Sequence, residues 1–267
     1  MTAAPAGPKL LRGLQVQVRV IGAVLMWEMI TRYGRDNLGF IWLFLEPMIF
    51  TLAVTALWSA TGLSHSANLP IVAFILTGYS TVLLWRNCSS RCCLAINAST
   101  ALLFHRPVRA LDILMGRILL EISGASMSFV GLGLLWISIG WADPPADLLK
   151  IVAGWVMLAW FTAALSLILG ALTSFNEIVE RLWHPIAYIL FPLSGAVFMV
   201  DWIAPQFREV VLWLPMVHCV ELVREGYFGP SVPTYHDMAY VFEVCLGMTA
   251  IGLALVRAAS RKVRYQQ

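Results

Sequence analysis

Residues Ile151 to Phe175 read IVAGWVMLAWFTAALSLILGALTSF, an apolar stretch that contains no acidic or basic side chain. An α-helix needs about 20 apolar residues to cross the hydrocarbon core of a bilayer. This stretch is long enough to cross and has no charge that would oppose insertion. It therefore predicts a transmembrane helix.

The composition of the whole chain agrees with that interpretation. Its 267 residues are 60% hydrophobic and only 12% charged, and the mean hydropathy is +0.78. A soluble domain has about 45–50% apolar and about 25% charged residues. These values exclude a soluble domain, a disordered chain, a disulfide scaffold and a conventional nucleic-acid binder. We expect an all-α integral membrane protein that forms a single transmembrane domain over residues 1–267.

Similar charge-poor windows predict six membrane-spanning helices. They lie at residues 38–63, 69–92, 118–141, 151–175, 182–200 and 238–256. An even number of spans places both termini on the same side of the membrane. Fifteen of the 18 Lys and Arg residues fall on that side, and the other three are Lys150, Arg208 and Arg224. Because cytoplasmic loops carry an excess of Lys and Arg, we expect both termini to be cytoplasmic.

Two segments outside the spans have patterns of their own. Within residues 9–36, apolar residues recur at steps of three and four from Leu11 to Leu25, while Lys9 and Arg12 fall on another face. This pattern predicts an amphipathic helix in the membrane interface.

The second segment, residues 201–237, lies on the outer side. It contains an uncharged stretch from Val210 to Val220 with Pro215 at its middle. As a helix it would measure about 16 Å, too short to cross. It predicts a re-entrant segment, with an amphipathic helix on the outer surface as the alternative.

Motifs for chemistry are missing from the sequence. There is no G-x-x-x-x-G-K-[ST], no H-E-x-x-H, no G-x-S-x-G and no C-x-x-C. The first of these would cradle nucleotide phosphates, and the others would mark proteolytic, hydrolytic or redox sites. We expect neither a catalytic site nor a metal site. Cys88, Cys92 and Cys93 are interpreted as buried apolar thiols, whereas pairing between Cys219 and Cys245 stays open.

A few polar residues fall within or beside the predicted spans. Glu46 precedes Pro47, and serves either a functional role or a hydrogen bond at the helix break that Pro47 causes. Arg86 and Arg91 follow the apolar part of the second span, where they either snorkel to headgroups or line a path for an anion. The 11 Trp residues favour interfacial belts, with a stacking track for sugar rings as the alternative.

Three stretches together resemble the permease subunits of ABC exporters that move capsular polysaccharides of the group 2 type. The first, TRYGRDNLGFIWLFLEP at Thr31–Pro47, is similar to the start of their first span. The second comprises LFHRPVRALD at Leu103–Asp112 and GRILLE at Gly116–Glu121, and is similar to their cytoplasmic connection between spans two and three. The third, WLPMVHCVELVRE at Trp213–Glu225, is similar to their outer re-entrant segment, with Leu214 where an Asn usually stands.

The resemblance implies a homodimer of six-span subunits, bound to two copies of a cytoplasmic ABC ATPase subunit that binds ATP and Mg. It implies export of a lipid-linked, acidic capsular polysaccharide from cytoplasm to periplasm. The expected further partners are a periplasmic polysaccharide co-polymerase and an outer-membrane export channel, with no nucleic acid. A separate ATPase agrees with the missing phosphate-binding motif.

The resemblance implies the contact with the ATPase, and together with the residue pattern it leads us to predict three groups of site residues. The substrate entrance and canyon comprise Arg32, Tyr33, Arg35, Trp42, Glu46, Arg86 and Arg91. The coupling loop, residues 94–116, contacts the ATPase through Phe104, His105, Arg106, Pro107 and Arg109, although a solvated basic loop is the alternative. The outer gate comprises Trp213, Pro215, His218, Glu221 and Arg224.

Other functions make different demands on the sequence. An O-antigen or teichoic-acid exporter permease is the alternative within the same class. An ion-coupled secondary transporter would use Glu46 or Glu243 as its proton site, but the two halves show none of the internal symmetry typical of such proteins. A membrane-embedded enzyme needs convergent acids or His residues, and His105 with Asp112 is the nearest approach.

Overall fold

A computed structural model describes residues 9–33, 39–60, 69–99, 108–230 and 232–265. All regular secondary structure in these ranges is helical. The elements are α1 (Lys9–Tyr33), α2 (Gly39–Ala60), α3 (Ile71–Cys92), α4 (Ala95–Ala98), α6 (Ala110–Ile139), α7 (Leu148–Phe175), α8 (Ile178–Leu193), the 3₁₀ turn η1 (Val200–Trp202), α9 (Pro205–Val211), α10 (Pro215–Phe228) and α11 (Met238–Tyr265). The all-α prediction is confirmed for these residues.

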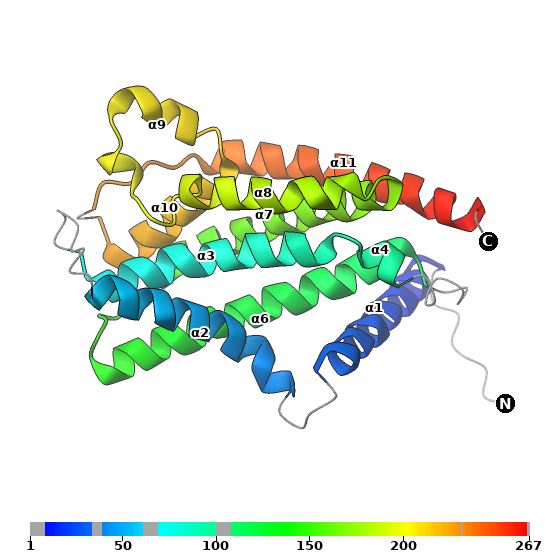
Figure 1. The fold of residues 1–267 in the computed structure, drawn as a ribbon, viewed down its shortest axis with the longest axis horizontal. Helices are drawn as coiled ribbons and strands as arrows, with labels where there is room; N and C mark the ends of the chain where they lie inside the picture. The colour runs from blue at the N-terminus through cyan, green and yellow to red at the C-terminus, as the bar shows by residue number, and fades with distance from the viewer. Residues whose placement is uncertain (1–8, 34–38, 61–68, 100–107, 231, 266–267) are drawn as a thin grey trace.

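The long helices run side by side along the length of the molecule (Figure 1). Helices α9 and α10 lie at one end of this bundle, and α1 lies at the other. The C-terminal end of α11 lies at the same end as α1 (Figure 1). The described parts of α1 and α11 that lie nearest the two termini are therefore on the same side.

Four of the described helices are long and apolar enough to cross a membrane: α3, α6, α7 and residues 238–262 of α11. The described apolar part of α2 is the shorter stretch Met48–Leu57, and α8 has only 16 residues. Length and composition thus establish four candidate spans in the described part of the chain. The arrangement with six spans stays a prediction.

The core of the bundle is built around α7, which packs against α3, α10 and α11. Trp85, Leu158 and Val241 are buried together in its main apolar cluster. Gly154 lets α10 approach closely, because a Cβ at this position would lie 2.9 Å from Val223 Cγ2. All five cysteines are buried free thiols, including Cys219, whose pairing the sequence left open.

Helix α6 begins earlier than the third predicted span. It starts at Ala110, so residues 110–116 of the segment expected to be a loop form its first two turns. The Asp112 carboxylate accepts the backbone N–H of Arg109 at 2.9 Å. An acidic side chain in a first turn satisfies free N–H groups there and stabilises the helix start.

Two helices share the predicted re-entrant segment. Helix α9 ends at Val211 and α10 begins at Pro215, with a short turn between them. Pro215 therefore lies at the first position of a helix rather than in the middle of a broken one. Proline fits this position because its missing N–H would have no partner in a first turn.

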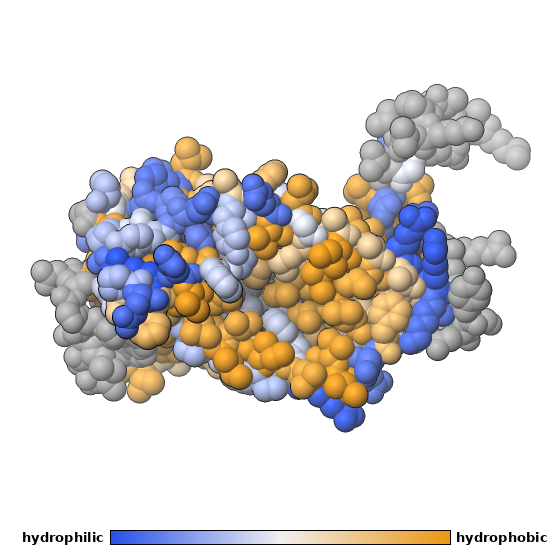
Figure 2. Space-filling model, turned by 90° about the horizontal axis from the view of Figure 1, so that it is seen from above, coloured by the Kyte–Doolittle hydropathy of each residue, from blue (hydrophilic) through white to orange (hydrophobic). Residues whose placement is uncertain are grey.

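The exterior of the bundle is apolar along its middle. Figure 2 shows a broad apolar area across one face, with hydrophilic residues gathered toward both ends. Ile189 of α8 and Leu246 and Ile251 of α11 are among the exposed apolar side chains. A broad exposed apolar surface of this kind marks contact with lipid or with another protein. Together with the four candidate spans, this surface is that of a multi-pass membrane protein.

Candidate functional site

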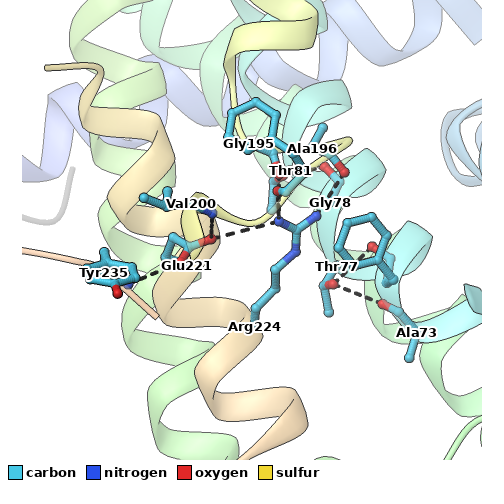
Figure 3. Close-up of polar contacts among 12 residues, drawn as sticks. Ala73, Thr77, Gly78, Thr81, Gly195, Ala196, Val200, Glu221, Arg224 and Tyr235 are labelled. Carbon is cyan, nitrogen blue, oxygen red and sulfur yellow. Dashed lines mark hydrogen bonds and ion pairs between the residues drawn. The ribbon is translucent and has the colours of Figure 1, made fainter. Parts of the chain in front are cut away.

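Arg224 of α10 organises the end of the bundle that the sequence predicts to be the outer one. Its side chain is fully buried, and its guanidinium donates to the backbone carbonyl oxygens of Gly195 at 2.6 Å and Ala196 at 2.8 Å (Figure 3). It also donates to the carbonyl of Phe198 and lies 4.1 Å from the centre of the Phe74 ring. These carbonyls belong to the turn after α8, where buried polar backbone groups need partners. Arg224 thus ties that turn to α10.

Glu221 lies one helical turn before Arg224 on α10 and is also fully buried. Its carboxylate accepts the backbone N–H of Val200 at 3.3 Å and that of Tyr235 at 3.1 Å. One carboxylate oxygen lies 4.0 Å from the Arg224 guanidinium (Figure 3). A buried ion pair needs such additional hydrogen bonds to offset the loss of hydration. The pair joins η1 and the connection before α11 to α10.

Gly78 allows α3 to approach this turn closely, because glycine has no side chain. A Cβ at Gly78 would lie 2.3 Å from the Ala196 carbonyl oxygen and 2.7 Å from Nη2 of Arg224. No side chain fits there without moving the turn. We name the turn residues 195–198 together with Gly78, Glu221 and Arg224 the outer cluster.

The other predicted outer-gate residues differ in their surroundings. His218 is buried, and its Nδ1 accepts the backbone N–H of Asp237 at 2.9 Å. Its Nε2 lies 2.7 Å from the carbonyl oxygen of Leu212, so the neutral ring donates through Nε2. Pro215 opens α10, and Trp213 is 77% exposed. His218, Glu221 and Arg224 therefore fix backbone segments, whereas the Trp213 side chain is exposed. Their role as a gate stays a prediction.

A second ionic group lies close to the outer cluster. The Glu225 carboxylate accepts a hydrogen bond from Nζ of Lys150 at 2.8 Å and also contacts Nε2 of His236. Hydrogen bonds from Lys150 and then from His236 hold the pKa of Glu225 below its ordinary value. The group connects the start of α7, the end of α10 and the segment before α11.

Replacing Glu225 with Gln tests this group. A depressed carboxyl pKa contributes stability above the ordinary Glu pKa, and that contribution is lost as the pH falls through the folded-state pKa. We expect the variant to be less stable by about 1 kcal/mol or less near neutral pH, with the difference disappearing in acid. Thermal unfolding in detergent across a pH series measures this difference. Glu209→Gln on α9 is the control, and a difference that grows in acid would contradict the assignment.

Charged side chains also meet at the α1 end of the bundle. Arg117 of α6 donates to Glu28 of α1 through Nε at 2.9 Å and Nη2 at 2.6 Å. Its Nη1 donates to the backbone carbonyl of Arg91 at 3.0 Å. The Arg91 side chain lies 3.4 Å from the Glu121 carboxylate. The sequence analysis did not single out Glu28, Arg117 or Glu121, although three charges beside apolar helices were a usable signal.

Arg86, the other arginine predicted to line the substrate path, has an aromatic partner. Its guanidinium lies 5.4 Å from the centre of the Tyr188 ring, so it links α3 to α8. Such cation–π contacts stabilise a charge at the edge of an apolar region. Both alternatives for Arg86, headgroup contact and substrate path, are compatible with this position.

Several predicted site residues lie outside what the structure describes. These are Arg35, Phe104, His105, Arg106 and Pro107, together with the side chains of Arg32, Tyr33, Trp42 and Glu46. Arg109 is described, and it precedes the first residue of α6 with an exposed side chain. Asp112 is buried and accepts Nε2 of Gln17 at 2.7 Å.

Within the described ranges, no three His, Cys, Asp or Glu side chains are grouped so that they could hold a metal ion. The ion pairs Arg224–Glu221, Lys150–Glu225 and Arg117–Glu28 account for the charged clusters described above. The described residues form a bundle of apolar helices whose two ends are held together by ion pairs and hydrogen bonds between helices.

Comparison with known proteins identifies the class of this bundle. Residues 19–228 match the ABC-2 type transporter family, and the chain belongs to that family.

Within this class the chain is similar to the capsule polysaccharide export inner-membrane protein CtrC of Neisseria meningitidis serogroup A, with 42% identity over 96% of this chain and 97% of that protein. It is 38% identical to the capsule polysaccharide export inner-membrane protein BexB of Haemophilus influenzae, over 96% of each chain. It is 26% identical to the polysialic acid transport protein KpsM of Escherichia coli, over 92% of this chain and 95% of that protein. With its apolar helices, this similarity assigns the chain to the inner membrane as a multi-pass protein.

Proposed function

We propose that the chain is the transmembrane subunit of an ATP-driven exporter that moves a lipid-linked, acidic capsular polysaccharide from cytoplasm to periplasm. The observation that carries this proposal is identity of 42% and 38% over nearly the whole chain to two capsule polysaccharide export inner-membrane proteins. Polysialic acid, which the name of the third relative gives as its cargo, carries a carboxylate on each sugar and is acidic. The lack of a phosphate-binding motif supports a separate ATPase subunit.

The proposed assembly has two copies of this chain and two copies of an ABC ATPase that binds ATP and Mg. Each chain has six spans, and both of its termini are cytoplasmic. Helix α1 lies at the level of the lipid headgroups on the cytoplasmic side, and α10 is re-entrant. The excess of Lys and Arg on the side of the termini supports this orientation. With 14 residues, α10 is about 21 Å long at 1.5 Å per residue, which is too short to cross.

The proposed substrate path begins beside the end of α1. Arg32 and Arg35 engage anionic groups of the substrate through paired N–H donors, a geometry that suits carboxylates and phosphates. Arg86 and Arg91 continue the cationic path, and Tyr33, Trp42 and Glu46 line it. A periplasmic co-polymerase and an outer-membrane channel receive the polymer.

The proposed coupling to ATP runs through residues 94–116. Phe104, His105, Arg106, Pro107 and Arg109 contact the ATPase, so that closure of the ATPase dimer moves this segment. Its described part supports such a connection, because α6 begins within the segment and extends into the bundle.

Affinity purification of the tagged protein from its native membranes in mild detergent tests the proposal. We expect an ABC-type ATPase subunit to accompany the chain in equal amount. A chain that purifies alone and takes up substrate when an ion gradient is applied would overturn the proposal. Glu46 and Glu243 would then be the residues to test as proton sites.

Charge reversal at Arg106 tests the coupling segment. Because this residue is proposed to contact the ATPase, we expect Arg106→Glu to remove substrate-stimulated ATP hydrolysis from the purified complex. Arg261→Glu, on the exposed end of α11, is the control for added negative charge. Retention of stimulated hydrolysis by Arg106→Glu would show that this residue does not couple.

A further inference from the structure

Helix α1 is attached to α6 at two points along its length. Gln17 donates to Asp112 at 2.7 Å, and Glu28 accepts two hydrogen bonds from Arg117 at 2.9 and 2.6 Å. Between these points the two helices touch directly. A Cβ at Gly116 would lie 2.9 Å from Val24 Cγ1 and 3.4 Å from the backbone nitrogen of Leu25. We name these contacts the α1–α6 clamp.

The charges of the clamp are largely removed from water. The Glu28 side chain is 4% exposed and that of Arg117 is 12% exposed. Separating such a pair leaves two poorly hydrated charges, which is far more costly than separating an exposed pair. Arg117 also donates to the Arg91 carbonyl near the end of α3. The clamp therefore resists sliding or separation of α1 from α6.

The clamp residues of α6 lie close to the segment that is proposed to contact the ATPase. Asp112 and Arg117 lie on the first turns of the helix that begins directly after residues 94–109, which are proposed to contact the ATPase. Asp112 also accepts the Arg109 N–H, so the start of α6 and the contact with Gln17 share one carboxylate. A displacement of the start of α6 would break these contacts unless α1 moved with it.

The C-terminal end of α1 lies next to residues proposed to form the substrate entrance. Glu28 lies five residues before Tyr33, where α1 ends, and Arg32 and Tyr33 are proposed to form the substrate entrance. On its outward side α1 carries exposed apolar residues, including Val18, Met26 and Ile30. Movement of α1 relative to α6 would break the hydrogen bonds on the clamped side.

We propose that α1 and the first turns of α6 move as one unit, which transmits ATPase-driven movement to the substrate entrance. Glu28 and Arg117 are positioning residues for the translocation cycle, since they act through α1 and not on the substrate. This inference rests on the proposed function, because it requires an ATPase at residues 94–109.

Neutral and exchanged charges test the ion pair. Glu28→Gln and Arg117→Gln are each expected to lower substrate-stimulated ATP hydrolysis and export by about tenfold, the scale of typical coupling between sites. Basal hydrolysis and the amount of ATPase bound stay unchanged. The exchanged pair, Glu28→Arg with Arg117→Glu, regains part of the coupling. Coupling that is unaffected in both single variants would overturn the inference.

A covalent clamp separates coupling from folding. The Cβ built at Gly116 lies 3.4 Å from Val24 Cβ, close to the separation of about 3.5–4.5 Å in disulfides. We expect Val24→Cys with Gly116→Cys to retain export when oxidised, because the two helices move together. The same disulfide restores coupling to Glu28→Gln. Each single Cys variant under oxidant is the matched control, and the native thiols are buried.

Export by the oxidised double-cysteine variant can also contradict the inference. Loss of export on oxidation, with recovery on reduction and with the ATPase still bound, would show that α1 must move relative to α6. This measurement needs no change at Glu28 or Arg117, so it decides the inference even where those variants do not assemble. If the unmodified complex shows no ATP-driven export at all, the proposed function fails, and with it the basis for the clamp.

Discussion

Replacing Arg224 with Met is expected to leave little folded protein in the membrane. The change removes the donor to three backbone carbonyl oxygens and leaves the buried Glu221 without its nearest positive charge. Breaking a buried ion pair costs about 3–5 kcal/mol. A typical protein is stable by about 5–15 kcal/mol, so this loss removes a large part of the margin. Membrane yield and thermal unfolding in detergent measure the effect.

Arg208 offers a matched control for this variant. Its guanidinium also donates to two backbone carbonyls, of Ile203 at 2.8 Å and Asp201 at 2.7 Å, but its side chain is 24% exposed. Water can replace the lost donors there, so Arg208→Met is expected to cost much less. Equal losses in the two variants would contradict the role assigned to burial in the outer cluster.

The same cluster can be disturbed from α3 without removing a charge. A side chain at Gly78 would occupy the position of the Ala196 carbonyl, so Gly78→Val is expected to approach the loss caused by Arg224→Met. Gly131→Val is the control, since a Cβ there meets no atom within 4 Å. A well-folded Gly78→Val variant would show that the turn after α8 adapts to a larger residue.

Replacing both Arg32 and Arg35 with Gln is expected to abolish export while the complex stays assembled. Two guanidinium groups at the proposed entrance hold an anionic substrate through charge-assisted hydrogen bonds, and Gln supplies neither the charge nor the paired donors. Surface capsule, detected on intact cells, measures export. Polymer inside the cells shows that synthesis continues.

Removal of two positive charges elsewhere controls for orientation in the membrane. Arg257→Gln with Arg261→Gln changes two exposed residues on the last turns of α11, on the side predicted to be cytoplasmic. We expect normal capsule from that variant. Normal capsule from Arg32→Gln with Arg35→Gln would remove these residues from the mechanism, and co-purification of the ATPase with both variants confirms assembly.

The helices could be predicted wherever the local pattern is unbroken. Residues 151–175 lie within α7, and the break before α10 falls where the sequence indicates an interrupted apolar stretch. The start of α6 was misplaced because Arg117 ends the charge-free window. In the structure that charge lies inside the helix, and its bonds to Glu28 stabilise it there.

The candidate site was predictable in part. Glu221 and Arg224 were singled out because charged residues next to an apolar stretch stand out, but their contacts with Val200 and residues 195–198 were not evident. Glu28 was not predicted as a site residue, since its partner Arg117 is 89 residues away in the sequence.

The sequence by itself determined that this is a helical membrane protein, that it lacks a phosphate-binding motif and which exporters it resembles. Those properties depend on composition, on short motifs and on windows of about 20 residues. The tertiary structure decided which charges pair. Arg117 and Glu28 are 89 residues apart, and Arg224 reaches carbonyls 26 to 29 residues away. Such pairs depend on how helices pack against each other, and local periodicity carries no information about that packing.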